Sequence, residues 1–114
     1  MRLFQIHQAA LAVAAVTWHE ALYGVRRLPF SRRRTVIEQF LDSSVGELSV
    51  LPYDQAAAEW HADERARLSQ IGLTPPFADG QIASVAATNG LALVTANVAD
   101  FQHFQGLTVE NWRM

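Results

Sequence analysis

Residues 10–17 read Ala-Leu-Ala-Val-Ala-Ala-Val-Thr, an uninterrupted apolar run that is typical of a strand covered on both faces. Residues 48–51 and 91–95 are predicted as further short strands, and residues 107–109 as a last one. Helical patterns separate these strands along the chain. Because strands that alternate with helices build βαβ units, the sequence predicts an α/β fold with a parallel sheet flanked by helices.

Capping signals predict where the helices begin and end. Thr17 and Glu20 have the spacing of a capping box, which predicts a helix that begins after Thr17. Ser31 is predicted to cap a second helix and Asp54 a third, because short oxygen-bearing side chains bond the free N–H groups of a first turn. Gly72 is placed to end the third helix.

Oxygen-bearing side chains follow the predicted strands. Glu20 comes after the first strand, Asn97 and Asp100 come after the strand at 91–95, and Asp79 precedes an apolar helix. Ligand sites of parallel sheets form outside the carboxyl ends of the strands, and Mg²⁺ prefers oxygen ligands. A metal site is therefore one interpretation. In the other, Glu20 completes the capping box, Asp79 interacts with a helix dipole, and Asn97 and Asp100 bond their own loop.

Five of the nine basic residues gather around one predicted helix junction: Arg26, Arg27, Arg32, Arg33 and Arg34. They form either a solvated face or a surface that contacts RNA phosphates or an acidic segment of a partner, to which the fork of arginine is suited. The formal net charge of −2 excludes a generally basic nucleic-acid coat.

The length of 114 residues predicts a single domain spanning residues 1–114. The chain has no cysteine, which excludes a disulfide scaffold and a thiolate metal site. Its longest apolar run is far shorter than the roughly 20 residues of a membrane span, and its first residues do not resemble a signal peptide. We therefore expect a cytoplasmic protein without membrane contact.

Three sequence blocks resemble those of PIN-domain ribonucleases of the VapC and FitB toxin type, and the resemblance extends over residues 10–112. The first family block is Thr-x-x-Glu-x-x-x-Gly, the second Pro-x-x-x-Asp-x-x-Ile-Ala, and the third a strand that ends in Val-Thr-x-Asn/Asp. The matching residues are Thr17, Glu20 and Gly24, then Pro75, Asp79, Ile82 and Ala83, then Val94, Thr95 and Asn97.

The resemblance implies a three-layer PIN-like α/β fold and a Mg²⁺- or Mn²⁺-dependent toxin endoribonuclease of a type II toxin–antitoxin system. Such an enzyme hydrolyses RNA phosphodiester bonds, for example in tRNA, binds a VapB-like antitoxin and commonly forms a homodimer. By position, Asp79 and Glu20 would ligate the metal ion. Asn97 would hold a metal-bound water, with Asp100 as the alternative, and Thr17 or Thr95 would support the metal ligands.

One segment of the family pattern is absent from this sequence. The family begins with a strand ending in Leu-Asp-Thr-Asn, whose aspartate is a metal ligand, whereas residues 2–8 here resemble the second helix of the family. The resemblance therefore predicts an N-terminally truncated domain that lacks one βα unit. It leaves a second function open, a catalytically inactive PIN module that only binds an antitoxin or dimerises.

Overall fold

The structure, a computed structural model, describes residues 3–6, 10–44 and 48–111. Its strands are β1 (Leu3–Ile6), β2 (Ala10–Ala14), β3 (Leu48–Leu51), β4 (Ala92–Thr95) and β5 (Thr108–Asn111). Its helices are α1 (Ala15–Arg26), α2 (Arg32–Ser44), α3 (Gln55–Gln70), α4 (Phe77–Thr88) and the short 3₁₀ helix η1 (Val98–Asp100). The α/β class predicted from the sequence is confirmed.

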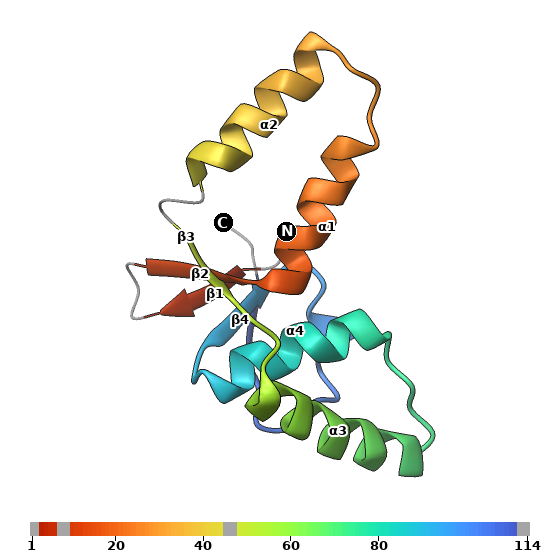
Figure 1. The fold of residues 1–114 in the computed structure, drawn as a ribbon. Coiled ribbons are helices and arrows are strands. Elements are labelled where there is room, and N and C mark those ends of the chain that lie inside the picture. The colour runs from red at the N-terminus through yellow and green to blue at the C-terminus, as the bar shows by residue number, and fades with distance from the viewer. Residues whose placement is uncertain (1–2, 7–9, 45–47, 112–114) are drawn as a thin grey trace.

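The strands form one sheet in the order β3-β2-β1-β4-β5. The outer pairs, β2 with β3 and β4 with β5, are parallel as predicted. β1 lies between them and is antiparallel to both β2 and β4. Figure 1 shows this sheet between the α1–α2 hairpin on one side and the α3–α4 pair on the other.

The helical interpretation of residues 2–8 is wrong for residues 3–6, which form β1; the other three residues lie outside the described part of the chain. Strand partners on both sides explain the difference. β1 makes ladder hydrogen bonds to β2 and to β4, whereas four residues of helix would gain almost nothing after the cost of nucleation.

The capping predictions differ in outcome. The Asp54 carboxylate accepts from Ala57 N–H at 2.9 Å and Ser31 Oγ accepts from Arg34 N–H at 3.2 Å, so both predicted caps are confirmed. The capping box is wrong, because β2 runs directly into α1, whose N-cap residue Ala14 makes no side-chain cap. Thr17 is therefore an interior residue of the first turns and does not cap the helix.

The main core lies where α3 and α4 pack on the sheet. Its fully buried large side chains include Leu68, Ile82, Val85, Leu93 and Phe101. Every residue from Ile82 to Ala86 is buried, which confirms the prediction of a helix that is apolar nearly all round. The described helices include none that is long and apolar enough to cross a bilayer.

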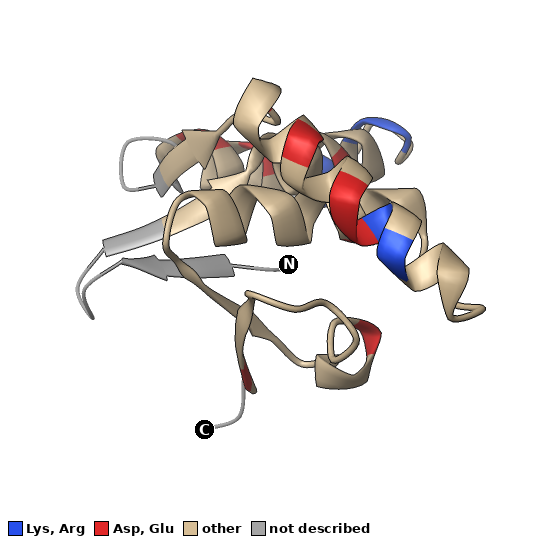
Figure 2. Cartoon of the chain, turned by 90° about the horizontal axis from the view of Figure 1, so that it is seen from below, with Lys and Arg blue, Asp and Glu red and all other residues tan. Residues whose placement is uncertain are grey.

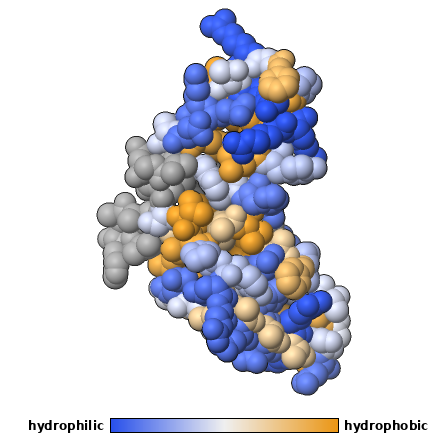
Figure 3. Space-filling view, viewed as in Figure 1, coloured by the Kyte–Doolittle hydropathy of each residue, from blue (hydrophilic) through white to orange (hydrophobic). Residues whose placement is uncertain are grey.

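The α1–α2 hairpin extends away from this core (Figure 1). Its side chains include large apolar groups in contact with water, with Phe30 91% and Phe40 67% exposed. Figure 3 shows apolar surface in the middle of this face of the molecule, where the hairpin joins the sheet, and mostly hydrophilic surface further out on the hairpin.

Candidate active site

The first turn of α4 carries the most deeply buried of the predicted site carboxylates. Asp79 is only 5% exposed, whereas Glu20 and Asp100 lie at the surface. The turn begins at Phe77 after the N-cap residue Pro76, which offers no side chain to the free N–H groups. A carboxylate in that position interacts favourably with the positive end of the helix dipole.

Gly80 allows α3 to approach this turn closely. A Cβ atom at position 80 would lie 2.1 Å from Nε2 of His61, so no larger residue fits without a shift. The His61 ring is 4% exposed, shares a 2.9 Å hydrogen bond between Nδ1 and the Tyr53 hydroxyl, and packs on Phe77 with 4.8 Å between ring centroids. Burial lowers the pKa of His61, and the positive charge of Arg65 lowers it further. The ring therefore serves as a neutral spacer between the two helices.

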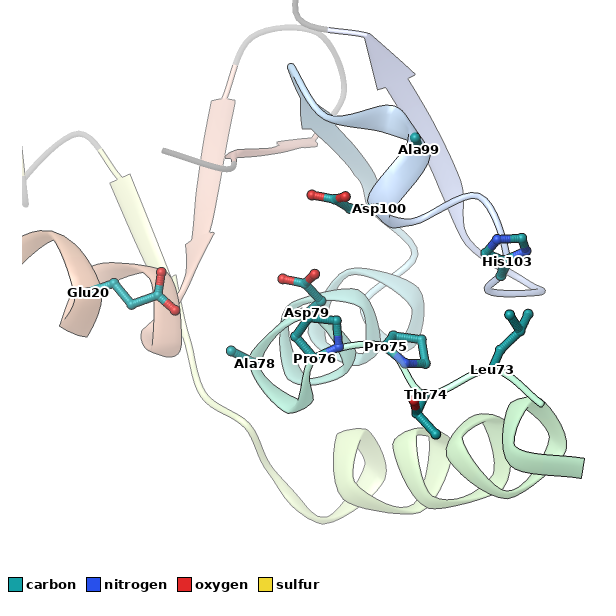
Figure 4. Close-up of a pocket in the computed structure, with 10 residues that line it drawn as sticks. All are labelled: Glu20, Leu73, Thr74, Pro75, Pro76, Ala78, Asp79, Ala99, Asp100 and His103. Carbon is teal, nitrogen blue, oxygen red and sulfur yellow. The ribbon is translucent and has the colours of Figure 1, made fainter.

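Three predicted carboxylates line one cavity of about 600 Å³, which we call the acidic cavity. Figure 4 shows Asp79 and Asp100 extending into the same open space from α4 and η1, with Glu20 facing them from α1. The lining residues are Glu20, Leu73, Thr74, Pro75, Pro76, Ala78, Asp79, Ala99, Asp100 and His103. The fold thus brings together side chains that are 59 and 21 positions apart in the sequence.

Asn97 is placed differently from the other predicted site residues. It is exposed and does not line the acidic cavity, and its backbone N–H donates to Thr95 Oγ1 at 3.0 Å. Asp100, given only as the alternative by the resemblance, occupies the cavity wall instead. His103 also lines the cavity and was not predicted, because nothing in the sequence around it marks a site.

A buried ion pair on α3 fixes the loop that contains His103. Glu64 is 8% exposed and accepts two hydrogen bonds from Arg67, at 2.7 and 2.9 Å, and one from the backbone N–H of Gln105, at 2.7 Å. Arg67 also donates to the carbonyl of His103 at 2.7 Å. Figure 2 shows acidic and basic residues close together along α3. The loop after η1 is therefore held on both sides of one cavity residue.

This network perturbs both of its charged members. The hydrogen bonds from Arg67 are the main reason why the pKa of Glu64 is lowered, although burial opposes them; the bond from Gln105 adds to the lowering. The hydrogen bond to Glu64 raises the pKa of Arg67. Both groups are thus held in their charged forms.

The acidic cavity contains oxygen donors of the kind that Mg²⁺ or Mn²⁺ binds, but they do not form a closed cage. In the described part of the chain, no group of three or more His, Asp or Glu residues is arranged to hold a metal ion. Thr17 Oγ1, three residues before Glu20, is buried without a hydrogen-bond partner among the described residues. The donors fit a hydrated Mg²⁺ ion, which keeps several waters and uses one or two carboxylates together with substrate phosphates.

The arginine cluster lies on the α1–α2 hairpin, away from α4 (Figure 1). Arg34 is a structural member: its Nε donates to Glu38 at 2.7 Å, its Nη1 donates to the Leu28 carbonyl at 3.0 Å, and its guanidinium lies 4.2 Å from the centre of the Phe30 ring. The other four arginines are exposed. One of the five therefore holds the hairpin turn together, and the rest present charge to solvent.

Comparisons with known proteins agree with this architecture, although no protein-family model matches the chain. The tRNA(fMet)-specific endonuclease VapC of Shigella flexneri is 34% identical over 110 residues, which cover 96% of this chain and 80% of that protein. Ribonuclease VapC2 of Haemophilus influenzae is 31% identical over the same shares.

Two solved toxin–antitoxin structures have the same fold. DNA-bound VapBC of Salmonella typhimurium superposes with a TM-score of 0.79 at 28% identity, over 90% of this chain and 75% of that one. VapBC-5 of Mycobacterium tuberculosis gives 0.73 at 31% identity, over 90% and 81%. With a relative more than 30% identical over most of both chains, and with the acidic cavity at the matching motifs, the chain belongs to the VapC ribonuclease family.

Proposed function

We propose that this chain is the toxin endoribonuclease of a type II toxin–antitoxin system and hydrolyses phosphodiester bonds of structured RNA such as tRNA. The observation that carries the proposal is the buried Asp79 at the start of α4, which opens into a cavity shared with Asp100 and Glu20. Support for tRNA as the substrate class comes from the Shigella flexneri relative, whose name records specificity for tRNA(fMet).

The charges of the acidic cavity make a divalent cation part of the proposal. Three carboxylates would repel an RNA phosphate, so a phosphodiester can enter only if a cation offsets their charge. Asp79, Asp100 and Glu20 would hold Mg²⁺ or Mn²⁺, which when bound supplies charge neutralisation and an acidified water. The residues of the chain then orient the substrate: α4 fixes Asp79, and the Glu64–Arg67 pair fixes the opposite wall at His103.

Replacing Asp79 with Asn is the direct test of this proposal. The substitution preserves size and removes the charge, and we expect metal-dependent cleavage of a tRNA preparation to be abolished. Glu59→Gln is the matched control, because Glu59 is an exposed carboxylate on α3 that does not line the acidic cavity. Undiminished cleavage by Asp79→Asn, with both variants folded by circular dichroism, would contradict the assignment.

A VapB-like antitoxin is the proposed protein partner, and we propose a homodimer as the assembled toxin. The exposed arginines of the α1–α2 hairpin contact either RNA phosphates or an acidic segment of the antitoxin. Arg32→Gln together with Arg33→Gln separates the two. If both arginines bind RNA, the slope of log K against log salt falls by about 0.7 for each phosphate that the variant no longer neutralises, the value for single strands. An unchanged slope assigns them to the antitoxin.

A second candidate, a catalytically inactive module that binds an antitoxin or dimerises, is favoured by one observation. The described residues contain no closed group of three metal-binding side chains. Calorimetric titration with Mg²⁺ discriminates between the two functions. Absence of heat at millimolar metal, together with absence of cleavage by the wild type, would favour the inactive module.

A further inference from the structure

A second, smaller cavity of about 180 Å³ adjoins the acidic cavity. Three residues, Leu73, Thr74 and Pro75, line both cavities, so the segment that leads into α4 forms the wall between them. The remaining lining residues of the smaller cavity are Arg65, Ser69 and Phe77. We call it the Phe77 cavity. Its lining combines an aromatic ring, a guanidinium and two hydroxyl groups in one concave site.

The aromatic ring in this cavity is accessible although it sits next to the core. Phe77 is 51% exposed, and the buried His61 packs against it with 4.8 Å between ring centroids. The Arg65 guanidinium carbon lies 5.2 Å from the centre of the Phe77 ring. Arg65 forms no ion pair with any residue in the described ranges, so its positive charge is available to a ligand.

The position of Phe77 relative to Asp79 gives this cavity its meaning. Both residues belong to the first turn of α4, yet Phe77 lines one cavity and Asp79 the other. Pro75 and Pro76 stiffen the segment before that turn, because each proline fixes its own φ angle. A polymer lying across this segment would therefore meet the acidic cavity and the Phe77 cavity one after the other.

We propose that the Phe77 cavity is a nucleotide subsite for the RNA substrate, an inference that rests on the proposed ribonuclease function. It binds a nucleotide that neighbours the scissile phosphodiester. The base stacks on the Phe77 ring, Arg65 pairs with a phosphate, and the hydroxyls of Ser69 and Thr74 lie within the same cavity to hydrogen-bond the nucleotide. Every base has a π face, so stacking of this kind binds RNA without requiring one particular base.

Phe77→Leu tests the subsite, because leucine keeps the apolar contact with His61 and removes the aromatic face. We expect the KM for RNA to rise by about fivefold or more, with kcat nearly unchanged, since loss of base stacking weakens binding of substrate and transition state alike. Phe77→Trp should restore the wild-type KM. Ile71→Ala is the control: Ile71 is 61% exposed at the end of α3 and lines neither cavity.

A second arm of the experiment locates the nucleotide. RNAs with a single abasic position on either side of the cleavage site are bound to wild type and Phe77→Leu. At one position, the abasic RNA and the substitution should each weaken binding, and together they should weaken it no further than either alone. A purely structural effect of the substitution would not depend on which base is missing.

The outcomes separate the two levels of the inference. If the wild type cleaves RNA but Phe77→Leu retains its KM, or if its effect is additive with every abasic position, the subsite is refuted and the ribonuclease function stands. If the wild type cleaves no RNA, the proposed function fails and the subsite fails with it.

Discussion

Replacing Glu64 with Ala is expected to loosen the wall of the acidic cavity and destabilise the whole domain. The Glu64 carboxylate is the acceptor for the Gln105 N–H at 2.7 Å, across 41 positions of sequence, and it also holds Arg67, which donates to the His103 carbonyl. A hydrogen bond to a charged group contributes about 1.5–3 kcal/mol. From the Gln105 bond, we expect the free energy of unfolding to fall by about 2 kcal/mol, which lowers the Tm of a domain of this size by about 10 °C.

The pH dependence of this effect follows from the lowered pKa of Glu64. Because the folded-state pKa lies below the ordinary value of 4.5, the carboxylate contributes its stabilisation fully above 4.5 and loses it as the pH falls through the folded-state value. The difference in stability between wild type and Glu64→Gln should therefore be constant near neutral pH and shrink in acid.

Urea unfolding followed by circular dichroism, at pH 7 and at several values below 4.5, measures both effects. Glu59→Ala is the control on the same helix, because Glu59 is exposed, and it should change the free energy of unfolding by no more than about 0.5 kcal/mol. A Glu64→Ala variant as stable as this control would refute the reasoning. So would a difference between wild type and Glu64→Gln that persists unchanged in strong acid.

Three further substitutions test contacts near the site, each by thermal unfolding. Gly80→Ala should destabilise the domain by about 1–3 kcal/mol through its clash with the His61 ring, and His61→Ala in the same chain should recover part of that stability, whereas simple additivity would contradict the contact. Thr17→Val should leave stability unchanged or raise it, because it removes a buried hydroxyl without a described partner; a clear decrease would reveal a partner. Asp54→Ala should cost about 1 kcal/mol by removing the α3 cap, and an unchanged Tm would argue against that cap.

Local chemistry explains which elements could be predicted from the sequence. The strand at residues 48–51 was predicted with the bounds it has in the structure, because Pro52 directly follows it. The caps at Ser31 and Asp54 were predicted because a short oxygen-bearing side chain acts within its own turn. Gly72 has a φ of 79°, in the left-handed region that favours glycine at the end of a helix.

The errors have a common cause in contacts between distant segments. Thr17 and Glu20 satisfy the capping-box pattern, but the end of β2 is set by its pairing with β3, and α1 begins directly after it. Residues 3–6 become a strand because β2 and β4 lie on either side of them. No local pattern carries that information.

The candidate site shows the same division. Glu20, Asp79 and Asp100 were predicted from their places after strands and before a helix, and all three line the acidic cavity. His103 and Phe77 were missed as site residues, because their positions depend on the Glu64–Arg67 pair and on the packing of His61 against Gly80. Such contacts join segments that no motif links.

The antiparallel strand at the centre of the sheet imposes an order on folding during synthesis. Ile6 pairs with Ala10, so the β1–β2 hairpin can form soon after it leaves the ribosome, whereas the pairing of Leu3 with Val94 must wait for almost the whole chain. At about 5–20 residues per second, the second edge of β1 stays without its partner for roughly 4–16 s. An open strand edge is a template for other chains. The nascent protein is thus most vulnerable to mispairing at its first strand, and the arrival of β4 ends that interval.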